Sequence, residues 1–287
     1  MNRRTVTIGA ALDEATQLLR ESPTPRLDAE VLLMHVCGLG RSELITRGTN
    51  SLNAAHDESF RALLTRRLAG EPIAHIVGFR EFWSLPLEIT PAVLIPRPET
   101  ELLVERALAH IPSHGACRVA DLGTGSGAVA LAIARERPQA QVLATDLSDA
   151  ALALAGRNAQ RLGIANIQFR KSDWFAGLAH ETFDVIVSNP PYVPAHDPHL
   201  TEGDVRHEPR QALIGGLDGL EDIRRIVADA RGHLRSEGWL LLEHGYDEAD
   251  AVATLLRNAG FIDSTCHRDL AGMPRVTEAQ SSVNVRR

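Results

Sequence analysis

The tetrad Asn189-Pro190-Pro191-Tyr192 holds residue types that can do chemistry on a planar nitrogen. Each proline locks φ near −65°, so the tetrad presents its polar groups on a fixed backbone. An amide or aromatic amine nitrogen attacks a methyl sulfonium poorly, because its lone pair is delocalised. Two acceptors, the side-chain carbonyl of Asn189 and the backbone carbonyl of Pro190, would turn that lone pair toward the methyl group and stabilise the developing charge. Tyr192 could stack on the planar group. No strong base is needed, because the nitrogen becomes acidic once alkylated.

A glycine loop lies upstream, in the sequence Asp121-Leu122-Gly123-Thr124-Gly125-Ser126-Gly127. Its glycines allow a tight turn and let the backbone approach a ligand closely. Asp146 ends the next expected strand, at the distance where a carboxylate could take both hydroxyls of a ribose. Asp121 would repel a pyrophosphate but pair with an ammonium group. The loop therefore favours an adenosyl cofactor that carries an amino acid end.

Other interpretations of these two motifs stay open. Gly123, Gly125 and Ala128 also fit the G-x-G-x-x-G/A fingerprint, so a nicotinamide-dependent oxidoreductase could use the same loop for a pyrophosphate. A glycine turn without a ligand, and a strand that simply ends in a Pro-Pro turn, would give the same sequences.

The elements that must position these residues alternate after Pro96. Apolar runs predict strands at 118–121, 142–145, 167–169, 183–187 and 239–243, and helical patterns at 129–136, 149–162, 220–234 and 247–259. This alternation is typical of βαβ units, so the sequence predicts an α/β fold with a parallel sheet and helices on both faces. Ligands bind at the carboxyl ends of such strands, where the loop, Asp146 and the tetrad all lie.

The front of the chain has a different pattern. Apolar residues recur at helical spacing over 8–19, 27–34 and 60–68, which predicts a small all-α bundle for residues 1–72. β-branched and aromatic residues then predict a β-hairpin linker over 73–95. The α/β sheet fills the third expected domain, 96–287.

In this order and spacing, the glycine loop and the tetrad resemble class I (Rossmann-like) S-adenosylmethionine-dependent N-methyltransferases. The resemblance implies that Asp173 and Trp174 flank the adenine, Trp174 by stacking and Asp173 by hydrogen bonding. A plain core position is the alternative for Trp174. The tetrad alone does not distinguish adenine, guanine or glutamine as the acceptor.

Further segments narrow the resemblance. They are PRLDAEVLL (25–33), GEPIAHIVGFREFW (70–83), LIPRPETE (94–101), 189–193, 208–210 with 212–213, and 215–220. Together they resemble the HemK/PrmC family, the protein-(glutamine-N5) methyltransferases that act on bacterial peptide chain release factors. The resemblance covers nearly the whole chain, and it implies a helical substrate-recognition domain and, as substrate, the Gln of a Gly-Gly-Gln loop. The chain departs from the family at Met273-Pro274 and in its tail.

Carried over position by position, the resemblance implies a site made of three groups of residues. The cofactor S-adenosyl-L-methionine would contact Asp121, Gly123, Thr124, Gly125, Ser126, Gly127, Asp146, Asp173, Trp174 and Asn189. The catalytic residues would be Asn189, Pro190 and Tyr192. The substrate glutamine would contact Asn189, Pro190, Pro191 and Tyr192, and its cleft would be bordered by Arg97 and Glu99. An ion pair at the surface or between domains is the alternative for the last two residues.

Composition limits the other classes of protein. With 30 Lys+Arg against 37 Asp+Glu, the net charge is −7, which disfavours a direct nucleic-acid target. No apolar run approaches the roughly 20 residues of a membrane span. Three widely spaced cysteines indicate a reducing, cytoplasmic setting. His196, His199 and His207 match no metal-binding spacing, so no metal is expected.

The resemblance implies a release factor methyltransferase, the cysteine usage indicates a cytoplasmic one, and we expect a monomer. Two alternatives of the same class are an N5-glutamine methyltransferase of a ribosomal protein and an exocyclic-amine methyltransferase of nucleic acid. A non-catalytic protein-binding module that keeps the fold is the alternative of another class.

Overall fold

The computed structural model describes residues 6–282. The chain forms two compact units, Met1–Gly78 and Phe79–Arg287. None of the helices within the described residues is both long and apolar enough to cross a membrane.

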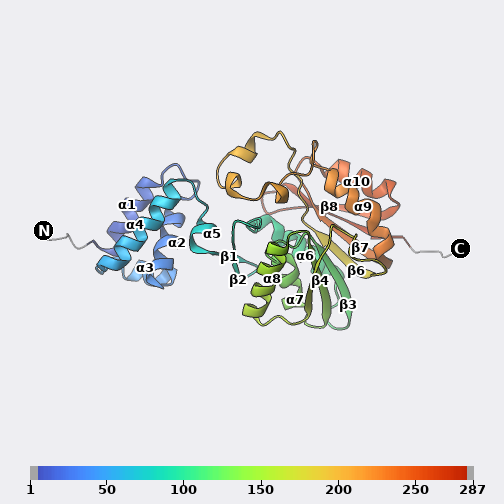
Figure 1. The fold of residues 1–287 in the computed structure, drawn as a ribbon, viewed down its shortest axis with the longest axis horizontal. Coiled ribbons are helices and arrows are strands. Elements are labelled where there is room, and N and C mark those ends of the chain that lie inside the picture. The colour runs from blue at the N-terminus through green and yellow to red at the C-terminus, as the bar shows by residue number, and fades with distance from the viewer. Residues whose placement is uncertain (1–5, 283–287) are drawn as a thin grey trace. The chain divides into compact units, whose positions relative to one another are not determined.

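The first unit is helical, and Figure 1 shows its elements in blue and cyan. Its helices are α1 (Ile8–Leu18), α2 (Pro25–Cys37), α3 (Arg41–Thr46), α4 (Ala54–Leu68) and α5 (Ile73–Val77). Their apolar faces meet in one core that includes Leu12, Leu33 and Phe60, all buried. Burial of these faces is what stabilises short helices, because isolated helices of this length are marginal in water.

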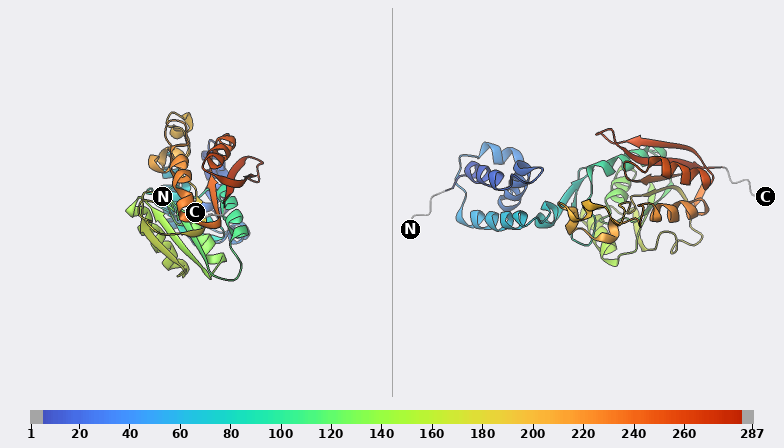
Figure 2. Two further views of the ribbon diagram at one scale, coloured as in Figure 1. Left: turned by 90° about the vertical axis from the view of Figure 1, so that its right-hand side faces the viewer. Right: turned by 90° about the horizontal axis from the view of Figure 1, so that it is seen from above.

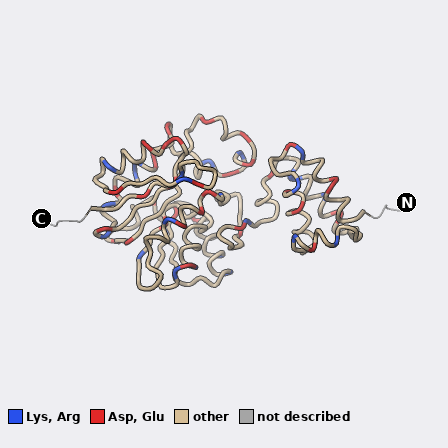
Figure 3. Tube along the Cα trace, turned by 180° about the vertical axis from the view of Figure 1, so that it is seen from behind, with Lys and Arg blue, Asp and Glu red and all other residues tan. Residues whose placement is uncertain are grey.

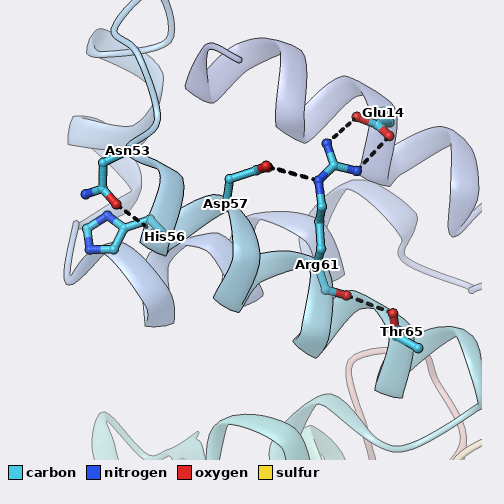
Figure 4. Close-up of polar contacts among 6 residues, drawn as sticks. All are labelled: Glu14, Asn53, His56, Asp57, Arg61 and Thr65. Carbon is cyan, nitrogen blue, oxygen red and sulfur yellow. Dashed lines mark hydrogen bonds and ion pairs between the residues drawn. The ribbon is translucent and has the colours of Figure 1, made fainter. Parts of the chain in front are cut away.

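Polar contacts join α4 to its neighbours at the surface of this unit (Figure 4). Arg61 donates to both carboxylate oxygens of Glu14 on α1, at 3.1 and 3.2 Å, and to Asp57 one turn earlier in α4, at 3.0 Å. Asn53 accepts from the backbone N–H of His56 at 2.8 Å and so caps the start of α4. Figure 3 shows acidic and basic residues interspersed along this unit. Exposed pairs of this kind add little stability, so the apolar core holds the unit together.

The segment expected as a hairpin linker begins as a helix. Residues 73–77 form α5, which follows Pro72 and ends where Gly78 takes a left-handed conformation, with φ of 79°. Proline is favoured at a helix start and glycine just past a helix end, so local rules outweigh the β-branched composition. The hairpin itself comes next, as β1 (Phe79–Phe82) and β2 (Leu85–Glu88), which pair antiparallel. The division between the compact units falls after Gly78 rather than after residue 72.

The second unit is built on a seven-stranded sheet within the described residues. Its strands are β3 (Cys117–Leu122), β4 (Ala140–Asp146), β5 (Ile167–Lys171), β6 (Phe183–Ser188), β7 (Leu234–Glu243), β8 (Phe261–Arg268) and β9 (Pro274–Ser281). The spatial order is β5-β4-β3-β6-β7-β9-β8. The first five strands in this order run parallel, and β9 pairs antiparallel with both β7 and β8. The predicted α/β fold with a parallel sheet is confirmed.

Helices lie on both sides of this sheet (Figures 1 and 2). They are α6 (Glu101–His110), α7 (Ala128–Glu136), α8 (Asp149–Leu162), α9 (Glu221–His233) and α10 (Ala249–Asn258), with short 3-10 turns at Pro98–Thr100, Pro198–Thr201, Val205–His207 and Arg210–Ala212. The apolar sides of α9 and α10 share a core with the strand residues Leu122, Ile186 and Leu242. The predicted helices at 129–136, 149–162, 220–234 and 247–259 are confirmed.

The direction of connection reverses at β3, which has β4 on one side and β6 on the other. A crevice opens at such a point, outside the carboxyl ends of the strands. The glycine loop follows β3, Asp146 ends β4 and Asn189 follows β6. The topology therefore brings the three sequence motifs to one edge of the sheet.

Candidate active site

A cavity of about 260 Å³ lies at this edge, within the second unit. Ten of the residues predicted to form a site line it: Asp121, Gly123, Thr124, Gly125, Ser126, Asp146, Asp173, Trp174, Asn189 and Pro191. Five others do not line this cavity: Arg97, Glu99, Gly127, Pro190 and Tyr192.

Backbone hydrogen bonds hold the glycine loop against the end of β4. The N–H groups of Gly123 and Thr124 both donate to the carbonyl of Thr145, at 2.9 and 2.8 Å. The carboxylate of Asp146 accepts from the N–H of Gly125 and from the N–H of Ser148, each at 2.9 Å. Asp146 is therefore fixed in place by the loops on either side of it.

Asp121 is a buried carboxyl at the end of β3, with only 2% of its surface exposed. Its side chain accepts from the Thr124 hydroxyl at 2.7 Å. Burial raises the pKa of Asp121 to about 7, against the lowering effect of the Thr124 bond. Burial also raises the pKa of Asp146. A cation placed beside Asp121 would relieve this cost, because an opposite charge favours the ionised form.

Trp174 forms a flat wall of the cavity next to the glycine loop. A Cβ on Gly123 would lie 3.3 Å from the Trp174 ring, so glycine lets the backbone approach this wall. The indole Nε1 donates to Asp222 at 3.1 Å, and Arg225 pairs with Asp173 at 2.8 Å. Asp222 and Arg225 also line the cavity. The side chain of Asp173 is thus already engaged by Arg225.

Gly127 does not line the cavity, and its surroundings give it a packing role. It lies directly before α7, as its N-cap residue, with φ of 85°, a conformation that glycine adopts without steric cost. A Cβ there would come within 3.0 Å of Leu131 and 3.1 Å of Ala155 on α8. Gly127 therefore allows close contact between α7 and α8.

The tetrad is tied to residues far away in the sequence. The amide nitrogen Nδ2 of Asn189 donates to the Thr100 hydroxyl at 3.2 Å. The Tyr192 hydroxyl donates to Oε1 of Glu243, at the end of β7, at 3.3 Å. No described residue donates a hydrogen bond to the side-chain oxygen of Asn189, which leaves this acceptor available to a ligand.

Glu243 is fully buried behind the tetrad, and burial raises its pKa to about 7. Hydrogen bonding by the hydroxyls of Thr100 and Tyr192 lowers the pKa in part. The charged groups that face it act in opposite directions: Glu99 raises the pKa and Arg275 lowers it. The pKa of Tyr192 is raised, first by burial and then by Glu243.

Two glycines let the segment after the tetrad pack against it by backbone alone. Val193 donates to the carbonyl of Leu213 at 2.8 Å. A Cβ on Gly215 would overlap the carbonyl oxygen of Pro191, and one on Gly219 would overlap the carbonyl oxygen of Tyr192. The tetrad is therefore held in place by packing of the segment 213–219 against it, as well as by its own prolines.

Arg97 and Glu99 do not pair with each other in an ion pair that the structure records. Arg97 instead pairs with Glu208 at 2.6 Å, and the backbone N–H of Ile95 donates to the same carboxyl at 3.2 Å. Glu208 is buried and holds residues 95–97 to the segment that follows the tetrad. This pairing partner was missed by the sequence analysis.

These residues fit an adenosyl cofactor with an amino acid end. The cavity offers one buried carboxyl with a raised pKa for a cation, a carboxylate at the end of β4 for a ribose, and a flat indole for a planar base. The buried carboxyl of Asp121, directly before the loop, does not suit a pyrophosphate. No group of three or more His, Cys, Asp or Glu side chains within residues 6–282 is arranged to hold a metal ion.

Sequence reasoning missed Thr100, Asp222, Arg225 and Glu243. Thr100 lies in the segment 94–101 that resembles the family, but nothing local showed its partner, and Asp222 carried no signal; the two meet their partners 89 and 48 positions away in the chain. Glu243 did carry one: it is an acidic residue at the end of a predicted apolar strand, as Asp146 is.

Comparisons with known proteins identify the family and the fold. The model of the PrmC N-terminal domain matches residues 10–78, and that of the methyltransferase small domain matches residues 99–208. A methyltransferase from Pyrococcus furiosus is similar in structure, with a TM-score of 0.54 and 21% identity over 76% of this chain and 98% of that one. The second unit thus has the class I methyltransferase fold.

Relatives in sequence are closer. The release factor glutamine methyltransferase of Salmonella typhimurium is 50% identical over 93% of this chain and 96% of that protein. The one from Xylella fastidiosa is 53% identical over 88% of this chain and 92% of that protein. The chain belongs to the release factor glutamine methyltransferase family, and the HemK/PrmC resemblance is confirmed.

Proposed function

We propose that this protein transfers a methyl group from S-adenosyl-L-methionine to the side-chain amide nitrogen, N5, of the glutamine in the Gly-Gly-Gln loop of bacterial peptide chain release factors. Family membership over most of the chain supports the reaction and the substrate. The observation that carries the proposal is Asn189, whose side-chain oxygen has no donor among the described residues while its nitrogen is held by Thr100.

The cofactor would be held by the cavity residues described above. Asp121 would face the ammonium group, Asp146 the ribose hydroxyls, and Trp174 the adenine, with the loop from Gly123 to Gly127 beneath. Asp173 is proposed as an adenine contact, although its pairing with Arg225 makes a direct bond depend on rearrangement of that pair. When bound, S-adenosylmethionine supplies an electrophilic methyl group on a sulfonium.

The tetrad would position the acceptor nitrogen. The side-chain oxygen of Asn189 and the backbone oxygen of Pro190 accept hydrogen bonds from the two N–H groups of the glutamine amide. This turns the lone pair of the amide nitrogen toward the cavity. The same oxygens stabilise positive charge on that nitrogen as its new bond forms. The alkylated nitrogen is acidic, so one proton passes to water. Pro191 and Tyr192 would shape the apolar surroundings, and Arg97 and Glu99 would border the entrance for the loop.

The other parts of the chain have proposed roles too. Residues 1–72 would recognise the release factor, 73–95 would link the domains, and 96–287 would carry the reaction. The match of the PrmC N-terminal domain to residues 10–78 supports the first assignment. We place the protein in the cytoplasm, which fits its three unpaired cysteines, and we expect it to act as a monomer.

The test is methylation by the purified protein with isotopically labelled cofactor. A release factor should take up one methyl group, located by mass spectrometry on the Gly-Gly-Gln peptide, and a release factor with that glutamine replaced by alanine should take up none. The Asn189→Ala variant provides the enzyme control. Equal labelling of both release factors would refute the assignment of this glutamine as the methylated residue. Label found instead on a ribosomal protein or on nucleic acid would identify that molecule as the substrate.

A further inference from the structure

We propose that Asp222, supported by Arg225, is a positioning residue that sets the plane of the Trp174 indole, and so the face that this wall of the cavity offers to the planar base of a nucleoside cofactor. The effect on cofactor binding rests on the proposed function, whereas the position of the indole is a property of this chain alone. Aromatic groups prefer offset-stacked or edge-on arrangements. The angle of the ring therefore matters as well as its presence.

The backbone of Trp174 is held by its own loop. Its φ of 47° lies in the left-handed region, which residues other than glycine rarely adopt. The Ser172 hydroxyl donates to the Trp174 carbonyl at 2.6 Å and accepts from the N–H of Gly177 at 2.9 Å. These contacts fix where the side chain leaves the backbone. They leave the angle of the ring open, since the χ2 torsion of tryptophan has a broad preference.

Two contacts at different ends of the indole fix that angle. Atoms Cζ3 and Cη2 of its six-membered ring would lie 3.3 and 3.6 Å from a Cβ on Gly123, so this end lies against the glycine loop. At the other end, Nε1 lies 3.1 Å from Oδ1 of Asp222. An indole N–H can only donate, so Asp222 is the acceptor. The ring cannot turn without losing the bond to Asp222 or pressing on the glycine loop.

Arg225 holds the carboxyl of Asp222 from within α9. The two residues are three positions apart in this helix, so they lie on the same face of it. Nη1 of Arg225 lies 3.5 Å from Oδ1 of Asp222, and Nη2 donates to both oxygens of Asp173 at 2.8 Å. Because Asp173 precedes Trp174 in the chain, the four side chains form a closed ring of contacts. All four line the cavity.

This ring of contacts orients side chains more than it stabilises the fold. The side chains of Arg225 and Asp173 are 48% and 46% exposed, and exposed ion pairs add little stability. The preceding arginine of α9, Arg224, pairs with Asp218 at similar exposure, but neither of these two residues lines the cavity. The two arginines therefore provide a matched comparison.

The test uses three variants and two controls. Asp222→Ala removes the acceptor, Asp222→Asn keeps a side-chain oxygen that can accept, and Arg225→Met removes the guanidinium. The controls are Arg224→Met and Asp229→Ala, which changes an exposed carboxyl on α9 outside the cavity. One readout is the NMR exchange rate with water of the Trp174 Nε1–H in the ligand-free protein, assigned by its loss in Trp174→Phe. The other is the dissociation constant of S-adenosyl-L-methionine by calorimetry.

We expect Asp222→Ala to speed the exchange of this proton and to weaken cofactor binding about 2- to 12-fold, the size of one well-aligned aromatic contact. Asp222→Asn should restore most of both readouts. Arg225→Met should change the exchange rate in the same direction, and both controls should leave it unchanged. In the Trp174→Phe protein, which has no indole N–H, Asp222→Ala should have no further effect on affinity, because residues that act through each other are not additive.

Unchanged exchange of the Trp174 Nε1–H in folded Asp222→Ala overturns the proposal. An equal loss of affinity when Asp222→Ala is added to Trp174→Phe also overturns it, because Asp222 would then act independently of the indole. If Asp222→Ala does not fold, as judged by circular dichroism, equal exchange rates in Arg225→Met and Arg224→Met overturn it. Wild-type protein that binds no S-adenosyl-L-methionine refutes the cofactor of the proposed function, while the exchange measurement needs no ligand and still tests the position of the indole.

Discussion

The buried carboxyl of Asp121 predicts how cofactor binding depends on pH. In the free protein, burial raises its pKa to about 7. A cofactor ammonium beside it favours the ionised form and lowers that pKa. The cofactor therefore binds preferentially to protein in which Asp121 is ionised. Its affinity is highest at pH values above the pKa of the free protein and falls as the pH drops below that pKa.

The size of the effect follows from the fraction of Asp121 that is ionised. For a pKa of about 7 the dissociation constant scales as 1 + 10^(7−pH), which is about 2 at pH 7 and about 33 at pH 5.5. We expect cofactor to bind roughly 16-fold more weakly at pH 5.5 than at pH 7. An α-amino group has a pKa of about 7.7–8.0, so the ammonium stays protonated across this window.

The assay is calorimetric titration with S-adenosylmethionine at four pH values between 5.5 and 7.0. Asp121→Asn is the matched control: it should bind about 10- to 100-fold more weakly at pH 7, as expected for loss of a charge-assisted bond, and it should lose most of the pH dependence. Any dependence that remains in the variant belongs to other groups such as Asp146, whose pKa burial also raises. Equal slopes in the two proteins would refute the assignment of Asp121.

Three more predictions concern single residues. Asn189→Ala should lower kcat about 10²–10³-fold while calorimetry shows a much smaller change in cofactor affinity; unchanged turnover would remove Asn189 from the chemistry. Trp174→Ala should weaken cofactor binding by about 0.5–1.5 kcal/mol beyond the loss of buried area, and Trp174→Phe should retain part of it; equal affinities in all three proteins would contradict stacking. Gly127→Ala should lower the free energy of unfolding by about 2–4 kcal/mol, from a φ of 85° and contacts near 3.0 Å. The control Gly156→Ala, in open space on α8, should raise it by about 0.5–1 kcal/mol; thermal unfolding that shows similar changes in both would contradict the packing argument.

The central strands and helices could be predicted from the sequence because both faces of a parallel sheet are buried. β3, β4 and β6 therefore appear as continuous apolar runs, with helical patterns between them. β8 could not be predicted in this way, since most of its residues are exposed and its pairing with β9 is irregular at two places. β9 contains the buried Glu278, whose carboxyl pairs with Arg106 and His110 of α6 and with His267 of β8. Such long-range pairing leaves no local pattern.

The candidate site likewise has a part that could be predicted from the sequence and a part that could not. Residues at strand ends could be predicted, because the fold places the carboxyl ends of parallel strands together. The side chains that surround each of these residues could not be predicted, because they come from other elements. The pairs are Arg225 with Asp173, Asp222 with Trp174, and Thr100 with Asn189. Tertiary contacts therefore decide how each predicted side chain is oriented.

Substitution of Gly215 or Gly219 should affect two properties of the enzyme differently, namely binding of the cofactor and placement of the acceptor amide. Side chains at these positions would overlap the carbonyl groups of Pro191 and Tyr192, whereas the glycine loop, Asp146 and Trp174, which also line the cavity, come from other segments. Substitutions there should give proteins that still retain cofactor yet no longer present an acceptor amide correctly. A random mutagenesis screen scored on cofactor retention would pass such clones, and a screen scored on product would reject them, so these two glycines are positions at which inert but cofactor-loaded enzyme could be obtained.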